Sequence, residues 1–112
     1  MKKNTKGKIM EQITYTIRNI SKNQLVYEFQ SRFRPIFKIS NKQLSTTIFI
    51  LEEFYFRIES NLTITVIFDK TDEDTIEINA VASGGKTGML QVSWGAERKA
   101  LKKVSQFFEN YK

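Results

Sequence analysis

The sequence contains no cysteine and no histidine among its 112 residues. Without cysteine, the chain has no disulfide frame, no thiolate zinc site and no thiol nucleophile. Without histidine, it lacks the commonest general base and the commonest metal ligand, so a serine–histidine–aspartate triad is excluded. No apolar run approaches the roughly 18 residues that a transmembrane helix needs. These absences predict a protein with no metal, no cofactor and no membrane contact.

The net charge of +6 is spread unevenly along the chain. Residues 1–40 carry nine basic and two acidic side chains, residues 41–80 carry three and eight, and residues 81–112 carry six and two. The first eight residues include four lysines, and no apolar segment follows them, so no secretory signal is evident. We therefore expect a flexible basic tail over residues 1–8, a single domain over residues 9–112 and a cytoplasmic location.

The segment from residue 9 to residue 20 fits two kinds of secondary structure. Its four isoleucines recur at helical spacing, which predicts a helix over residues 9–20 with Thr5 as the N-cap. The stretch Ile13–Ile17 also alternates like a strand, and its β-branched residues lose rotamer freedom in a helix. We favour the helix because Ile9 and Ile20 extend the stripe at helical spacing. A turn is predicted at Ser21–Asn23.

Four later segments alternate between apolar and polar residues, which predicts strands with one buried face. They begin at Leu25, Ser45, Leu62 and Ile76. Their inward residues are expected to be Leu25, Tyr27, Phe29, Phe33, Ile48, Ile50, Phe54, Phe56, Ile58, Leu62, Ile64, Val66, Phe68, Ile76, Ile78, Ala80 and Ala82. Pro35 cannot donate a hydrogen bond to a sheet, so it marks an end, an edge or a bulge of the first strand. Phe37 and Ile39 resume the alternation after it.

Acidic residues interrupt this pattern at two places. Glu52 lies on the apolar side of its segment, and an unpaired carboxylate in a core is costly, so we expect a bulge or bend at Glu52–Glu53. The polar stretch 69–74 is expected to be a hairpin loop. It lacks the carboxylate spacing, central glycine and terminal glutamate of a calcium-binding EF-hand loop, so no metal ligand is predicted there.

The last segment predicts the clearest helix, from about Gly95 to Tyr111, after a short extended piece over Met89–Trp94. Its apolar stripe consists of Ala100, Leu101, Val104, Phe107, Phe108 and Tyr111. Ala80 and Ala82 are small enough for a helix to pack closely on their strand. The predicted fold is α+β, a two-layer domain in which an N-terminal and a C-terminal helix cover an antiparallel sheet of about four strands.

A glycine-rich stretch follows the last predicted strand. Ala80–Thr87 satisfies a loose form of the phosphate-binding P-loop pattern, but one of the two glycines is missing and Gly88 stands where a helix should begin. The loop can instead form an anion-binding nest or serve as a connector. Trp94 either anchors the following helix or faces a partner. The candidate ligand or partner loop comprises Gly84, Gly85, Lys86, Thr87, Gly88 and Trp94.

A basic stripe lies on the C-terminal helix. Its members recur at helical spacing and, with the lysines of residues 1–8, form a candidate surface for phosphate groups of nucleic acid. The aromatic residues fall mainly on inward positions, so no platform for stacking bases is evident. The stripe consists of Arg98, Lys99, Lys102 and Lys103.

Three short motifs precede the closing helix: Ala82–Gly85, Gly88–Leu90 and Ser93–Gly95. They resemble a family of small, uncharacterised bacterial proteins, a domain of unknown function with a glycine-rich loop, an acidic-Trp-Gly turn and a terminal helix. Ser93 stands here in place of the acidic residue. The order of helix, meander and helix extends the resemblance over most of the chain. The family has no established activity, so the resemblance implies the fold and the importance of Gly84–Gly95 but no function.

The residues favour a non-enzymatic binding module for a small ligand or a protein partner, with the glycine loop and Trp94 in its recognition surface. Nucleic-acid binding is the alternative, and a phosphate-binding enzyme is less favoured. No catalytic residue is predicted. A free sheet edge would also permit a homodimer by strand addition, unless the charged residues along the strands block it.

Overall fold

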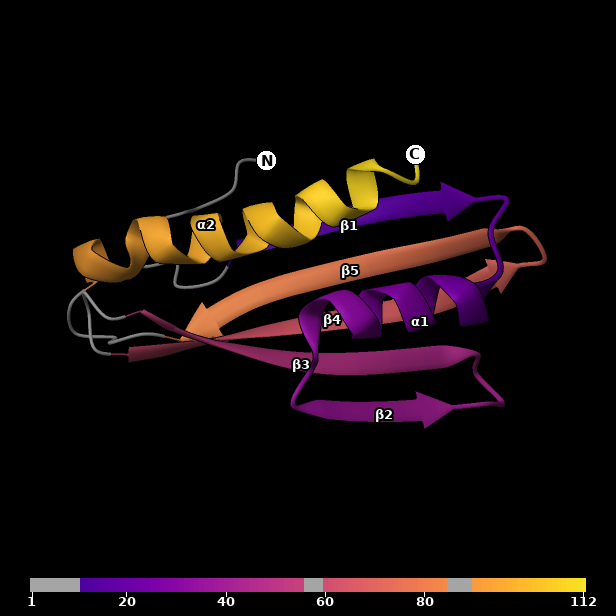
Figure 1. Ribbon diagram of the computed structural model, residues 1–112, viewed down its shortest axis with the longest axis horizontal. Helices are drawn as coiled ribbons and strands as arrows, with labels where there is room; N and C mark the ends of the chain where they lie inside the picture. Colours follow the sequence, from indigo (N-terminus) through magenta and orange to yellow (C-terminus); the bar gives the residue numbers. More distant parts are fainter. Residues whose placement is uncertain (1–10, 56–59, 85–89) are drawn as a thin grey trace, which may run out of the picture.

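The computed structural model describes residues 11–55, 60–84 and 90–112, with side chains over residues 12–52, 62–83 and 98–112. Its elements are β1 (Glu11–Arg18), α1 (Lys22–Phe33), β2 (Phe37–Asn41), β3 (Thr46–Tyr55), β4 (Ser60–Asp72), β5 (Thr75–Gly84) and α2 (Leu90–Glu109). The strands form one antiparallel sheet in the order β1-β5-β4-β3-β2, and both helices lie on the same face of it (Figure 1). The predicted α+β class is confirmed, with five strands in the described part of the chain. The predicted tail over residues 1–8 lies outside the described residues.

The helix predicted over residues 9–20 is wrong, because residues 11–18 form strand β1. This strand pairs with β5, and Ile13 lies opposite Ala80 while Ile17 lies opposite Ile76. Ile17 is buried and Ile13 half-buried on the face that the helices cover. The β-branched residues and the strict alternation over Ile13–Ile17 therefore outweigh the wider isoleucine spacing.

The strand predicted from Leu25 is also wrong, because residues 22–33 form helix α1. Leu25, Phe29 and Phe33 are four residues apart, a spacing that places side chains on one face of both a strand and a helix. Tyr27 distinguishes the two, since a strand would turn it inward whereas a helix turns it outward. Its side chain is 70% exposed.

Local hydrogen bonds explain where α1 begins and ends. The Ser21 side chain accepts a hydrogen bond from the Gln24 N–H at 3.0 Å, so the predicted turn at Ser21–Asn23 contains the N-cap. At the other end Arg34 adopts a left-handed conformation, and its N–H donates to the Gln30 carbonyl at 2.9 Å. Pro35 follows at once and cannot continue the helix.

The inward face of β3 is the opposite of the predicted one. Thr47, Phe49 and Leu51 are buried beneath the helices, whereas Ile48 and Ile50 are half-buried on the uncovered face. Glu52 shares that uncovered face and is exposed, so its carboxylate needs no bulge. Pairing between β3 and β4 is continuous past it, and the shift of register falls between Lys70 and Asp72 of β4 instead. The predictions for Phe54, Phe56 and Ile58 lie outside the described side chains.

The predictions for β4 and β5 are confirmed at every inward position. The buried residues are Leu62, Ile64, Val66, Phe68, Ile76, Ile78, Ala80 and Ala82. The turn between the two strands is shorter than predicted, because both strands continue up to a turn at Glu73–Asp74.

Helix α2 begins earlier than predicted. It starts at Leu90, so the extended conformation predicted over Leu90–Trp94 is wrong, and Met89 lies outside the described residues. Leu90 and Trp94 are four residues apart and extend the helical spacing backwards from Ala100 and Leu101. The predicted stripe is confirmed, with Phe107 and Tyr111 at its half-buried margin.

Phe29 of α1 lies at the centre of the core. Its ring centroid is 5.5 Å from that of Phe49 on β3, 5.3 Å from that of Phe68 on β4 and 5.7 Å from that of Phe108 on α2. A single side chain thus joins both helices and two strands, and the two helices and the sheet share one core.

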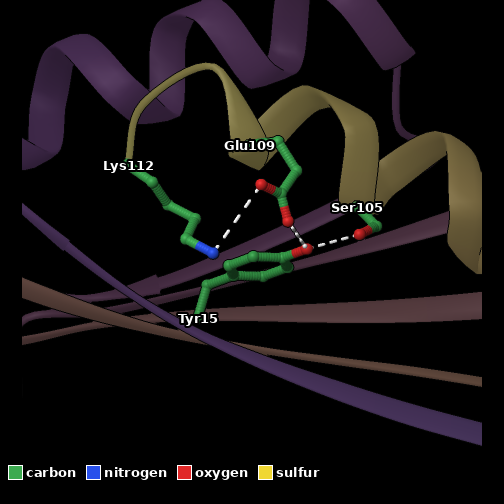
Figure 2. Close-up of polar contacts among 4 residues, drawn as sticks. All are labelled: Tyr15, Ser105, Glu109 and Lys112. Carbon is green, nitrogen blue, oxygen red and sulfur yellow. Dashed lines mark hydrogen bonds and ion pairs between the residues drawn. The ribbon is translucent and has the colours of Figure 1, made fainter.

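Polar contacts fix the end of α2 to β1 and to α1. The Tyr15 hydroxyl of β1 is hydrogen-bonded to Ser105 Oγ and donates to Glu109 Oε2 at 3.0 Å (Figure 2). Lys112 Nζ lies 3.7 Å from Glu109 Oε1 and 5.6 Å from the centroid of the Tyr15 ring. On the other side of the helix, the Tyr111 hydroxyl donates to Glu28 of α1. In the described part of the chain, no helix is long and apolar enough to cross a membrane.

Candidate anion-binding pocket

The helix-covered face of the sheet becomes polar at one corner. Lys38 and Ser40 of β2 lie opposite Phe49 and Thr47 of β3, so they belong to the face that is apolar elsewhere. Lys70 of β4 is the next inward position after Phe68. Strand β2 lies beyond α1 at the edge of the sheet, and neither helix covers it (Figure 1). Charged and hydroxyl side chains thus occupy positions that would otherwise complete the core.

These residues line a pocket of about 430 Å³ at the start of α1. Four segments of the chain contribute a lysine to it: α1, β2, the turn after β2, and β4. The lysines are Lys22, Lys38, Lys42 and Lys70, and the hydroxyl and carboxylate residues of the lining include Ser40, Thr47 and Glu73. Cationic side chains therefore outnumber carboxylates in its lining.

Lys22 and Thr47 meet at the inner end of the pocket. Thr47 is only 3% exposed, and its Oγ1 accepts a hydrogen bond from Lys22 Nζ at 2.7 Å and lies 3.4 Å from Ser40 Oγ. Burial lowers the pKa of the Lys22 ammonium; Asp69 opposes this effect, and the positive charges of Lys38 and Lys70 add to it. The Lys22 ammonium is thus held in a place that disfavours its charge.

The first turn of α1 adds further donors. Ser21, Lys22 and Asn23 all line the pocket. The Ser21 cap satisfies the Gln24 N–H, which leaves the N–H groups of Lys22 and Asn23 without a partner inside the helix. The first turn contains no acidic residue, so no side chain there offsets the positive end of the helix dipole.

No carboxylate neutralises the four lysines by a direct ion pair among the residues that the structure describes. Lys38 Nζ lies 3.5 Å from the amide oxygen of Gln30 and 5.8 Å from the centroid of the Phe49 ring. Several ammonium groups beside hydroxyl and backbone donors are a typical environment for an anion such as phosphate.

The glycine loop predicted as a ligand or partner site is mostly outside the described residues. Gly84 is the last residue of β5 and lies opposite Leu62. Gly85, Lys86, Thr87 and Gly88 are not among the described residues, and Trp94 lies in α2 with a side chain outside the described set. Their proposed role stays a prediction.

The predicted basic stripe lies on α2, and none of its members lines the lysine pocket. All four side chains are exposed, as a phosphate-contacting surface requires. Lys103 lines a separate cavity of about 60 Å³ with Glu52 of β3. Binding of nucleic acid by Arg98, Lys99, Lys102 and Lys103 also stays a prediction.

Sequence reasoning missed the pocket. One signal was available, because Lys70 continues the inward alternation of Leu62–Phe68 and a lysine at such a position is unusual in a core. The position of Lys22 at a helix N-terminus was hidden by the strand predicted from Leu25. Nothing local to the sequence places Lys22, Lys38, Lys42 and Lys70 together.

Comparison with known proteins identifies a family whose function is unknown. No curated protein and no solved structure matches the chain. Among the described residues, no group of three or more acidic, histidine or cysteine side chains is placed to hold a metal ion. One family model matches the chain over residues 1–112, in agreement with the resemblance inferred from the C-terminal motifs. The chain therefore belongs to DUF6054, a family of unknown function.

Proposed function

We propose that this chain is a non-enzymatic binding protein that holds an anionic small molecule in the lysine pocket at the start of α1. The observation that carries the proposal is the convergence of Lys22, Lys38, Lys42 and Lys70, from four separate segments, on one pocket with no direct ion pair to a described carboxylate. A bound anion would offset the repulsion among these charges and accept hydrogen bonds from them.

The composition of the pocket supports binding over catalysis. Its described lining offers ammonium, hydroxyl and amide groups, with Glu73 as the carboxylate at its margin. Glu73 is exposed on the β4–β5 turn and forms no hydrogen bond or ion pair with Lys22 or Thr47 that would pair a base with a nucleophile. The arrangement can therefore hold and orient an anion, and we assign it no reaction.

The proposal is tested by amide-resolved NMR titration of the full chain with pyrophosphate at 0.15 M salt. We expect saturable shifts at Lys22, Asn23 and Thr47. The variants Lys22→Met and Lys70→Met should each weaken binding by about tenfold or more, because each removes one cation from the pocket. A dispersed amide spectrum for each variant shows that it is folded.

A double variant on α2 provides the matched control. Lys99→Glu with Lys102→Glu changes the net charge by more than either pocket variant but leaves the pocket intact, so the pyrophosphate affinity should change less than twofold. Binding that is lost in this control and kept in Lys22→Met would overturn the proposal and favour the α2 stripe, the surface expected for nucleic acid. Saturable shifts confined to Gly84–Gly88 would move the anion site to the glycine loop.

A further inference from the structure

The volume of the pocket constrains the size of the ligand that can fill it. Its volume of about 430 Å³ falls in the range of small-molecule sites. A bare inorganic ion would contact only a small part of such a pocket. If the pocket holds an anion, the ligand is therefore expected to carry an organic part as well.

The charges in the pocket are not spread evenly. The negative charge of Asp69 and the positive charges of Lys38 and Lys70 all act on the charge of Lys22, and Lys42 is not among the groups that do so. Lys22, Lys38 and Lys70 thus form a positive centre beside Thr47 that Asp69 offsets in part, while Lys42 lies on the turn after β2. Lys22 and Asn23, whose N–H groups have no partner inside the helix, line the same pocket.

A concentrated centre of this kind suits a phosphate group better than a carboxylate. A phosphate monoester carries between one and two negative charges near neutral pH and offers three strong acceptor oxygens. A carboxylate carries a single charge on two oxygens. Three ammonium groups with helix N–H donors can satisfy the phosphate oxygens and its charge together.

Apolar side chains line the same pocket beside the lysines. They are Ile20, Val26 and Ile76, of which Val26 and Ile76 are buried in the core. Ile20 follows β1 and is half-buried, so part of its surface remains accessible. It offers a place where a carbon group attached to the phosphate can lose contact with water.

From these observations, and resting on the proposed function, we infer that the ligand is an organic phosphate monoester. Its phosphate lies among Lys22, Lys38 and Lys70, and its carbon part packs against Ile20. The pocket would therefore distinguish such a molecule from inorganic phosphate by its apolar part and from an organic acid by its charge.

The test is calorimetric titration of the full chain with three probes at equal ionic strength: phenyl phosphate, methyl phosphate and benzoate. Phenyl phosphate should bind about tenfold or more tightly than methyl phosphate, since only the phenyl ring can cover Ile20. It should exceed benzoate by a similar factor, because benzoate lacks the second charge.

Two isoleucine variants locate the carbon part. Ile20→Ser should lower the affinity for phenyl phosphate about fivefold or more and leave that for methyl phosphate unchanged, whereas the conservative Ile20→Val should keep the preference. Ile39→Ser is the matched control, because Ile39 lies on β2 but faces the uncovered side of the sheet and is 49% exposed.

The outcomes separate this inference from the proposed function. Equal affinities for phenyl and methyl phosphate, both weakened by Lys22→Met, would overturn the apolar contact and leave the anion pocket standing. Benzoate binding as tightly as phenyl phosphate would overturn the assignment of a phosphate. Binding of all three probes that ignores Lys22→Met would overturn the proposed function, and this inference with it.

Discussion

The two helices cover the same face of one sheet, but the inward sheet residues beneath α2 differ in polarity from those near the start of α1. Under α2, the inward residues of β1 and β5 are apolar and in part very small, as at Ala80 and Ala82. Beyond the start of α1, the inward positions of β2, β3 and β4 include Lys38, Thr47 and Lys70. The first region is a closed core, and the second is a polar hollow.

The contrast between these two regions indicates which residues are needed for folding. Small apolar residues let α2 approach the sheet closely, and this burial stabilises the domain. Lysines at inward positions bury less apolar surface than core residues do and repel one another, so stability alone does not explain their presence. Substitutions beneath α2 should therefore change the free energy of unfolding, whereas those at the lysine pocket should chiefly change binding.

The largest expected effect comes from the α2 side of this comparison. Phe108→Ala removes a fully buried ring that packs against Phe29 and Phe68, and we expect a loss of about 3–5 kcal/mol in the free energy of unfolding. Urea denaturation monitored by circular dichroism measures it. Phe37→Ala on the uncovered face of β2 is the control, with less than about 1 kcal/mol expected. Equal losses for both would show that the closed core is not where the stability lies.

A smaller effect is expected from the polar contacts that tie α2 to β1. Tyr15→Phe keeps the ring packed on Phe108 but removes the hydroxyl bonded to Ser105 and Glu109, at a cost of about 1 kcal/mol. The same urea titration reports it. Tyr27→Phe, at the exposed tyrosine of α1, should leave the stability unchanged. If the two variants behaved alike, the contacts in Figure 2 would contribute nothing to stability.

The smallest effect concerns the contact between Tyr111, just after α2, and Glu28 of α1. The hydrogen bonds from Tyr111 and Gln24 lower the pKa of Glu28 below its usual 4.5. Their contribution to the free energy of unfolding is therefore present above pH 4.5 and is lost as pH falls through the lowered pKa. Burial, with a further contribution from Glu28, raises the pKa of Tyr111 from 10.0 to about 12. The contribution of protonated Tyr111 to the free energy of unfolding is therefore present below pH 10 and is lost as pH rises towards 12.

Tyr111→Phe tests this contact at both ends of the pH range. Unfolding free energies measured against pH should fall less steeply in the variant below pH 4.5 and between pH 10 and about 12. Tyr27→Phe again serves as the control. Acid and alkaline slopes that match the unsubstituted chain would show that the two helices are not coupled through this pair.

The sequence was most informative where one periodicity excluded the other. The alternation over Leu62–Phe68 and Ile76–Ala82 fits only strands, and both were predicted correctly with their inward faces. Leu25, Phe29 and Phe33 fit the spacing of a strand and that of a helix equally well. Only the exposure of Tyr27 distinguishes the helix from the strand. In β3 both parities are apolar, so the buried side was settled by packing against α1 and not by the pattern.

The pocket could not be predicted from any single segment of the sequence. The sequence predicted that Phe37 and Ile39 resume the inward alternation, which left Lys38 and Ser40 on the outward side. That prediction is wrong, because Phe37 and Ile39 lie exposed on the uncovered face and Lys38 and Ser40 lie opposite the buried Phe49 and Thr47. The meeting of Lys38 and Ser40 with Lys22 depends on a helix start at Ser21 and on the pairing of β2 with β3. Such a site becomes visible only when the sheet order is known, because its members come from four separate segments.

The pairing of β1 with β5 also determines when this domain can be completed. Because synthesis proceeds from the N-terminus, residues 11–18 are made 57 to 71 positions before their partners at residues 75–82. The contacts of Tyr15 with Ser105 and Glu109 form later still, because both residues belong to α2. Contacts so distant along the chain slow folding, because a long loop must close before they form. During synthesis β1 therefore lacks its partner strand until residues 75–82 have been made.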